Sequence, residues 1–163
     1  MVALPGPGLA AFLREERILV PLAAADAGGV LAALAAALAA DLGRGETAER
    51  IAREFAEREA LGATAPGGGI ALPHCRSSAA RSPLLALGIH PAGIPFGARD
   101  GAPVRAFFAI VSPSDRPGSH LEILAAVSRW ARETGRLAEL VAARTPREVV
   151  ALVARRAGRE SAA

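Results

Sequence analysis

The chain has 163 residues, of which 52% are hydrophobic, so it is long and apolar enough for one domain with a substantial core and is not a disordered protein. All nineteen basic residues are arginine, which raises the isoelectric point to about 10.8, but the formal net charge is only +3. Charges of both signs are mixed, as in ETAERIAREFAERE, which is typical of solvated helix faces and excludes a dedicated nucleic-acid surface from our expectations. The single cysteine excludes an internal disulfide and fits a reducing compartment.

The first third of the chain opens with a segment rich in proline and glycine, residues 1–16, which we expect to be a lead-in. It lacks the basic region of a secretion signal. A short β-type run follows at residues 17–22, and Asp26 is placed to cap a helix that runs to about Leu42. The longest apolar stretch, residues 18–42, is built mostly from alanine and is interrupted by proline, aspartate and glycine. We therefore expect no membrane insertion and a cytoplasmic protein.

A second helix is predicted over residues 46–60, where apolar positions recur at helical spacing. The pattern then changes to that of strands, which are predicted at residues 67–73, 82–90 and 93–113. The last of these segments reads as two strands joined around the turn dipeptide Asp100-Gly101. Residues 104–111 are nearly all apolar and should be central in the sheet.

Two further helices carry start signals. Ser119 and Glu122 have the spacing of a capping box, so a helix is predicted to begin at Ser119. Thr145 and Glu148 repeat the same spacing, with Pro146 at the first helical position.

Two helices, a group of strands and two more helices predict an α/β domain. The sheet should be mixed, because one link is a hairpin while others pass through helices, and helices should flank it on both sides in three layers. We expect a single domain over residues 17–156 and a flexible tail at residues 157–163.

His74 is the first candidate for chemistry. It follows an apolar strand and Pro73, whose ring fixes its own φ and favours an extended Leu72. The imidazole therefore emerges at a rigid strand end, where α/β sheets often hold functional sites. Taken alone, the residue is better explained as a turn histidine whose hydrogen bonds are satisfied.

His120 changes that balance. It is predicted at the first helical position after Ser119 and shares a face with Ile123, Leu124 and Val127, so it should point inward. A helix start disfavours the charged imidazole and favours a bound anion such as phosphate. A core histidine bonded to a carbonyl is the alternative. If the strand end and the helix start share one edge of the sheet, the two imidazoles meet over one pocket.

The sequence also offers two other kinds of site. Cys75 beside His74 suggests a cysteine hydrolase, but neighbours on an extended strand point apart, so the thiol would need His120 or His90 as its base. Three histidines without zinc spacing are weak evidence for a metal, and His90, just before Pro91, is expected at the surface. We therefore expect no metal. We also expect no cofactor, because the three glycines lack the lysine of a nucleotide-binding loop.

Three segments of the chain resemble one protein family: EREALGATAPGGGIALPHCR, GIPFGARDGAPVRAFFAIVSP and HLEILAAVSRW. They are similar to the enzyme IIA domain of the bacterial phosphotransferase system (PTS), type 2, the fructose, mannitol and nitrogen-regulatory class. That family shows an Arg-Glu pair, a turn with threonine and glycine, a segment ending in Ile-Pro-His and a His-Leu helix start. The match runs from about residue 17 to residue 155. The turn TAPGGG and Cys75 depart from the family pattern.

The resemblance implies a phosphocarrier built on a mixed sheet between helices. The family's phosphorylated histidine falls on His74 and its second active-site histidine on His120. Its phosphate-binding arginine and turn threonine fall on Arg58 and Thr64. The donor would be the carrier protein HPr, and the phosphate would pass to a IIB partner in sugar uptake or act as a signal to a regulatory target. A binding module of the same fold that is not phosphorylated remains the alternative.

Overall fold

The computed structural model describes residues 6–43 and 45–160. Short 3-10 turns and one strand come first, two helices and four strands follow, and three helices complete the chain. The elements are η1 (Leu9–Phe12), η2 (Glu15–Arg17), β1 (Ile18–Leu19), α1 (Ala27–Ala39), α2 (Ala48–Ala60), β2 (Ile70–Ala71), β3 (His74–Ser77), β4 (Leu84–Ile94), β5 (Val104–Pro113), α3 (Pro117–Ala131), α4 (Arg136–Ala142) and α5 (Pro146–Glu160).

The sheet is mixed, as predicted. Its order is β1-β4-β5-β2, and β3 pairs with β5 beyond the end of β2. Strands β4 and β5 are antiparallel. The other pairings are parallel: β1 pairs with β4, and both β2 and β3 pair with β5. Every residue of β5 is buried except the half-buried Arg105, which confirms that this apolar run lies inside the sheet.

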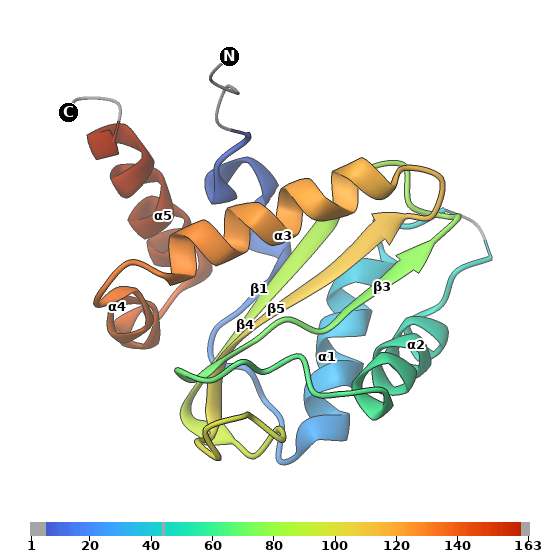
Figure 1. The fold of residues 1–163 in the computed structure, drawn as a ribbon, viewed down its shortest axis with the longest axis horizontal. Helices are drawn as coiled ribbons and strands as arrows, with labels where there is room; N and C mark the ends of the chain where they lie inside the picture. The colour runs from blue at the N-terminus through green and yellow to red at the C-terminus, as the bar shows by residue number, and fades with distance from the viewer. Residues whose placement is uncertain (1–5, 44, 161–163) are drawn as a thin grey trace.

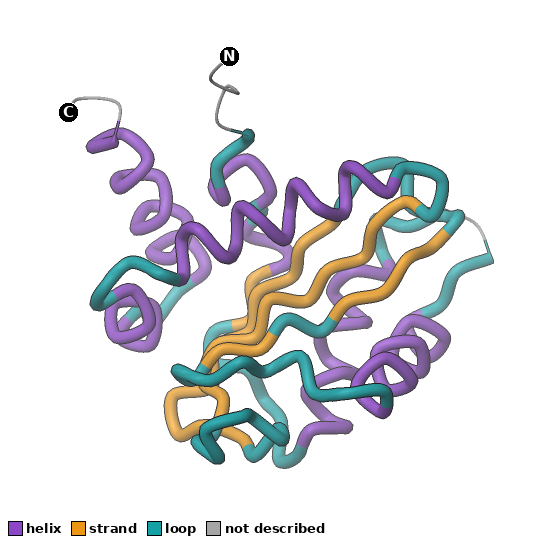
Figure 2. The backbone as a smooth tube through the Cα atoms, in the orientation of Figure 1, coloured by secondary structure: helices purple, strands orange, loops and turns teal. Residues whose placement is uncertain are grey.

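Helices cover both faces of the sheet, which confirms the predicted three layers (Figure 1, Figure 2). Neighbouring residues of β5 point to opposite faces: Phe107 packs among the side chains of α1 and α2, and Phe108 among those of α3 and α5. The leucine stripe of α1, at Leu31, Leu34 and Leu38, is buried on the first face. On the second face Leu9 and Leu13, from the segment before β1, join the core.

Two predicted helix starts are confirmed. The Asp26 carboxylate accepts a hydrogen bond from the backbone N–H of Gly29 (2.8 Å) at the start of α1. The Thr145 hydroxyl accepts one from the N–H of Glu148 (3.1 Å) at the start of α5, where Pro146 occupies the first position. Helix α1 ends at Ala39, three residues earlier than predicted, and α2 begins at Ala48 after the capping residue Thr47.

The capping box predicted at Ser119 is wrong. Helix α3 begins two residues earlier, at Pro117, because proline has the φ of a helix and needs no N–H partner at a helix start. The Ser119 hydroxyl therefore lies inside the first turn and donates to the carbonyl of Arg116 (2.8 Å). As a consequence His120 is the fourth residue of the helix, not the first.

The predicted pair of strands between residues 93 and 113 is only partly correct. Strand β4 runs through Pro91 to Ile94, and residues 95–103 form an open loop before β5, where a tight turn was expected. Asp100 accepts hydrogen bonds from the N–H groups of Gly68 (2.9 Å) and Ala102 (3.0 Å). These two bonds lower the pKa of the Asp100 carboxyl and tie the loop to the glycine-rich turn.

The strand predicted at residues 67–73 is shorter and is followed by another. Strand β2 contains only Ile70 and Ala71, and β3 begins at His74, so His74 opens a strand instead of ending one. Pro73 interrupts the ladder because it has no N–H, but its carbonyl accepts from the N–H of Ile110 (2.9 Å) and keeps the chain against β5.

Helix α4 was not predicted. It has seven residues and follows Gly135, which has φ of +83°. A helix this short shows little more than one repeat of the apolar pattern, so periodicity alone does not reveal it.

Candidate functional site

His74 is held in one tautomer by the backbone. Its Nδ1 lies 2.8 Å from the carbonyl oxygen of Leu72. Because a carbonyl oxygen only accepts hydrogen bonds, Nδ1 carries the proton and donates it. The lone pair of the neutral ring is then on Nε2, so Nε2 is the nucleophilic nitrogen of this side chain.

His120 lies beside His74, as the sequence analysis expected if the two elements met at one edge of the sheet. The two ring centroids are 5.3 Å apart and the planes are tilted by 51°. His120 is 6% exposed, and its Nδ1 lies 2.7 Å from Oγ of Ser112, a fully buried residue of β5. The predicted inward orientation of His120 is confirmed.

The register of β3 against β5 explains why these side chains meet. His74 pairs with Ile110, and Arg76 pairs with Ser112, two positions further along both strands. Residues two apart on a strand point to the same face, and Ile110 belongs to the core under α3. The face of β3 and β5 that α3 covers therefore presents His74, Arg76 and Ser112 to His120.

The electrostatic environment keeps His120 neutral. Burial lowers the pKa of its imidazole below the ordinary value, and the neighbouring His74 and Arg76 lower it further. Arg76 is exposed, and its positive charge is one of the causes that lower the pKa of His120. A neutral imidazole donates one N–H and leaves one lone pair, which suits the binding of a phosphoryl group.

Arg58 lies in the last turn of α2 and Thr64 lies on the loop that follows, and their hydrogen bonds join the helix end to that loop. The Arg58 guanidinium donates to the carbonyl of Gly62 (2.8 Å). Thr64 donates its backbone N–H (3.0 Å) and its hydroxyl to the carboxylate of Glu59. The carbonyl of Thr64 accepts from the N–H of Leu72 (3.0 Å), so the loop holds the residue whose own carbonyl fixes His74.

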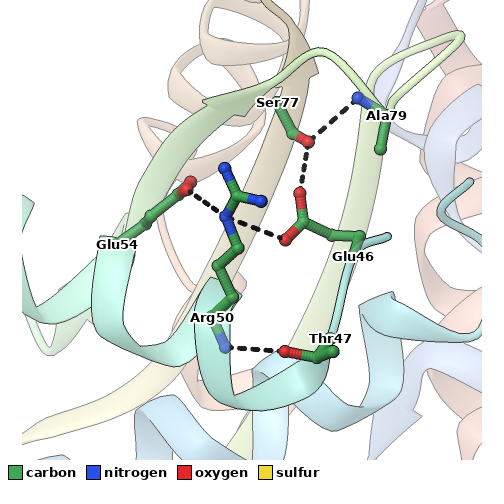
Figure 3. Close-up of polar contacts among 6 residues, drawn as sticks. All are labelled: Glu46, Thr47, Arg50, Glu54, Ser77 and Ala79. Atoms are coloured by element: carbon green, nitrogen blue, oxygen red, sulfur yellow. Dashed lines mark hydrogen bonds and ion pairs between the residues drawn. The ribbon is translucent and has the colours of Figure 1, made fainter. Parts of the chain in front are cut away.

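The opposite face of β3 carries a polar cluster that anchors the strand to α2 (Figure 3). The Ser77 hydroxyl donates to Oε2 of Glu46 (2.7 Å) and accepts from the N–H of Ala79 (3.1 Å). The Glu46 side chain is 4% exposed and pairs with Nε of Arg50 at 3.6 Å. The same Nε lies 3.5 Å from Glu54. This cluster thus holds β3, the strand that carries His74, on the face opposite that histidine.

Cys75 belongs to this rear face and not to the histidine pair. It packs against the core formed with α1 and α2. Burial raises the pKa of its thiol well above the ordinary value, and the charge and hydrogen bonding of Glu54, then the charge of Glu46, raise it further. A thiol that stays protonated is a poor nucleophile, which argues against a cysteine hydrolase.

His90 is not the surface residue that the sequence suggested. It is half-buried, and its Nε2 lies 3.2 Å from the carbonyl oxygen of Ala24, which joins β4 to the segment before α1.

Within residues 6–43 and 45–160, no group of three or more His, Cys, Asp or Glu side chains has an arrangement that could hold a metal ion. In the same residues, no helix has the length and apolar character needed to cross a membrane.

Two members of the site were missed by sequence reasoning. Ser112 sits at the end of a long apolar run, and a single polar residue there, eight positions before His120, was the available signal. Leu72 acts through its backbone carbonyl, which no side-chain pattern reveals.

Comparison with known proteins indicates the family of the chain. The model of the family described as "Phosphoenolpyruvate-dependent sugar phosphotransferase system, EIIA 2" matches residues 11–156. A curated nitrogen regulatory protein of Pseudomonas aeruginosa is 43% identical over 77 residues, which is 47% of this chain and only 50% of that relative's length.

Solved structures agree on the fold. The nitrogen regulatory protein IIA-Ntr of Neisseria meningitidis superposes with a TM-score of 0.81 at 22% identity, over 89% of this chain and 98% of that one. The Escherichia coli complex of enzyme IIA mannitol with phosphorylated enzyme IIB mannitol gives a TM-score of 0.72 at 18% identity, over 87% of this chain and 96% of the other. With the family model covering residues 11–156, the chain belongs to the EIIA type 2 family of the phosphoenolpyruvate-dependent sugar phosphotransferase system.

Proposed function

We propose that this protein is a phosphocarrier in which Nε2 of His74 accepts a phosphoryl group from the phosphorylated carrier protein HPr. The observation that carries the proposal is the 2.8 Å contact from Nδ1 of His74 to the Leu72 carbonyl, which leaves Nε2 as the nucleophile. A second, neutral imidazole lies next to it. Membership of the family supports the same class of reaction.

The transfer itself needs positioning more than covalent help from the protein. The lone pair of His74 Nε2 attacks phosphorus in line with the bond to the donor's nitrogen. The new N–P bond forms as the old one breaks, and the electron pair of the broken bond stays on the donor's imidazole. The ring of His74 gains positive charge in this step, and the Leu72 carbonyl, which accepts from Nδ1–H, stabilises it.

His120 would bind the oxygens of the transferred group. If the Ser112 hydroxyl donates to Nδ1 of His120, the proton of the neutral ring is on Nε2, where it can donate to phosphate. The reverse arrangement would leave the buried Ser112 hydroxyl hydrogen without a hydrogen-bond acceptor among the described residues. The exposed Arg76 adds positive charge near the same place.

We assign Arg58 and Thr64 a positioning role. Their hydrogen bonds run to Gly62 and Glu59, and through the Thr64 carbonyl to Leu72. They would act on the phosphate by fixing the loop that holds Leu72, and through it the tautomer of His74.

The test is phosphorylation in a reconstituted system. The purified chain is incubated with phosphoenolpyruvate, enzyme I and HPr, and the product is analysed by intact mass and by its lability to acid and base. We expect one acid-labile, base-stable phosphate on the wild type and on His90→Ala, and none on His74→Ala. An unmodified wild-type chain would instead favour the alternative, a binding module that is not phosphorylated.

The acceptor of the phosphate divides the proposal in two. The Escherichia coli neighbour is a complex with a phosphorylated IIB, which supports transfer to a IIB domain and on to a sugar. The names of the Pseudomonas and Neisseria proteins support a regulatory use of the phosphate. Incubating the phosphorylated chain with a panel of IIB domains separates the two, because a regulatory protein keeps its phosphate throughout.

The remaining assignments follow from this function. We propose that the domain spans residues 17–156, which lie within the family match, and that it works in the cytoplasm with protein partners and without a cofactor.

A further inference from the structure

Arg136, the first residue of α4, is a buried charge that the histidine site does not use. It is 2% exposed. Its Nη2 donates to the carboxylate of Glu133, and its guanidinium carbon lies 5.0 Å from the centroid of the Trp130 ring. Its Nε and Nη1 find no hydrogen-bond partner among the described residues. Leaving donors of a buried charged group without acceptors is costly, so these N–H groups call for an acceptor.

Trp130 supplies a third donor of the same kind. The residue is 6% exposed, and its indole Nε1 has no partner in the part of the chain that the structure describes. Trp130 lies near the end of α3 and stacks with the Arg136 guanidinium across the α3–α4 turn. Two buried side chains in contact therefore hold three nitrogen donors that lack acceptors.

Both side chains line one cavity of about 130 Å³. The cavity lies where η1 packs against α3 and α5, at the end of α3 away from His120 (Figure 1). Its apolar walls include Leu9, Ala126 and Val153. A cavity of about 150 Å³ holds a benzene ring, so there is room here for a small ion but not for a nucleotide.

The charges around the cavity favour an anion. Its ionisable side chains are Arg129, Glu133 and Arg136, two cations and one carboxylate. Arg129 also donates to the carbonyl of Pro7 (3.2 Å), which holds the segment before η1 over this region. The carboxylate of Glu133 already accepts from one nitrogen of Arg136, and the unpartnered groups are all donors. Oxyanions match such a set of N–H groups, and the charge shortens and strengthens the bonds.

We propose that this cavity is a second anion site, which binds a small oxyanion, a carboxylate or inorganic phosphate, through Arg136 and Trp130. The site is separate from the histidine pair. Occupancy would join α3 and α4 through one ligand and fill the space beside η1 and α5.

The chain offers a direct reporter, because Trp130 is its only tryptophan and it has no tyrosine. The indole fluorescence and the single indole N–H resonance of the ¹⁵N-labelled full chain are followed during titration with sodium phosphate and, separately, sodium acetate, at constant ionic strength set by chloride. We expect a saturable change with at least one of the two anions, and the comparison tells which chemistry is preferred.

Substitutions test whether the change in the indole signals comes from binding in this cavity. Arg136→Gln should weaken binding by about tenfold or more, the usual size for loss of a charged hydrogen-bond partner. Arg132→Gln, an exposed arginine at the end of α3, is the matched control and should bind like the wild type. His74→Ala should also keep the response, which separates this site from phosphate held by the histidine pair.

Several results would overturn the proposal. One is an indole resonance that neither anion moves, as expected if only water fills the cavity. Another is an Arg136→Gln variant that responds like the wild type. If that variant does not fold, Glu133→Gln decides, since it keeps the guanidinium and removes the competing negative charge. Tighter binding supports the site, and unchanged or lost binding contradicts it.

Discussion

The imidazoles of His74 and His120 lie with their centroids 5.3 Å apart, although one belongs to the edge strand β3 and the other to helix α3 on the face above it. Each ring is held by a separate hydrogen bond through Nδ1, to the Leu72 carbonyl and to the Ser112 hydroxyl. In the proposed function, Nε2 of His74 would accept the phosphoryl group and Nε2 of His120 would donate a hydrogen bond to its oxygens.

His120→Ala should slow the first phosphoryl transfer without moving the phosphate to another residue. Removing one preorganised donor from a site of developing charge costs about a hundredfold in rate. The measurement is the initial rate of phosphate incorporation from phospho-HPr by rapid quench. Ser112→Ala should give a smaller loss, about tenfold, because it removes only the bond that selects the tautomer. A Ser112→Ala variant slower than His120→Ala would contradict these roles.

The stability of the protein should fall at mildly acidic pH partly because of His120. Its pKa in the folded protein lies below the ordinary value of about 6.5, so the unfolded chain takes up the proton first as pH falls. The contribution is constant above that value and is lost progressively below it. Urea denaturation of the wild type and His120→Gln from pH 7.5 to pH 5.5 should show a steeper loss in the wild type. Parallel curves would mean that His120 does not titrate as described.

Cys75 should be slow to react and dispensable. Burial and the neighbouring Glu54 raise the pKa of the thiol, so little thiolate exists at neutral pH. Modification by a chromogenic disulfide at pH 7.5 should be much slower in the folded chain than in urea, and Glu54→Gln should speed it. Cys75→Ala should be phosphorylated at the wild-type rate. Loss of phosphorylation in that variant would return the thiol to the active site.

Ser77→Ala should destabilise the fold through Glu46. The carboxylate is nearly fully buried and loses the only hydroxyl that donates to it among the described residues. A buried polar group left without its partner costs about 1–3 kcal/mol in the free energy of unfolding. Chemical denaturation measures the loss. Arg50→Ala is the control: its side chain is 61% exposed, so the change should cost less than about 1 kcal/mol. Equal losses would show that the cluster does not depend on Ser77.

Local patterns in the sequence predicted much of the fold. The Asp26 and Thr145 caps and the apolar run of β5 each depend on only a few neighbouring residues, so a short stretch of sequence reveals them. The start of α3 was predicted wrongly because two local signals compete there, and Pro117 at the first position prevails over the Ser119 capping box. Helix α4 is too short for its pattern to be read.

The sequence by itself determined which residue types were available: two histidines in suitable local settings, one cysteine and no lysine. Only the tertiary structure decided which of them meet. The parallel pairing of β3 with β5 brings His74 and Ser112 to the face under α3 and turns Cys75 to the opposite face. These contacts join residues far apart in the chain. Strand register and helix packing create them, and no short-range pattern encodes either.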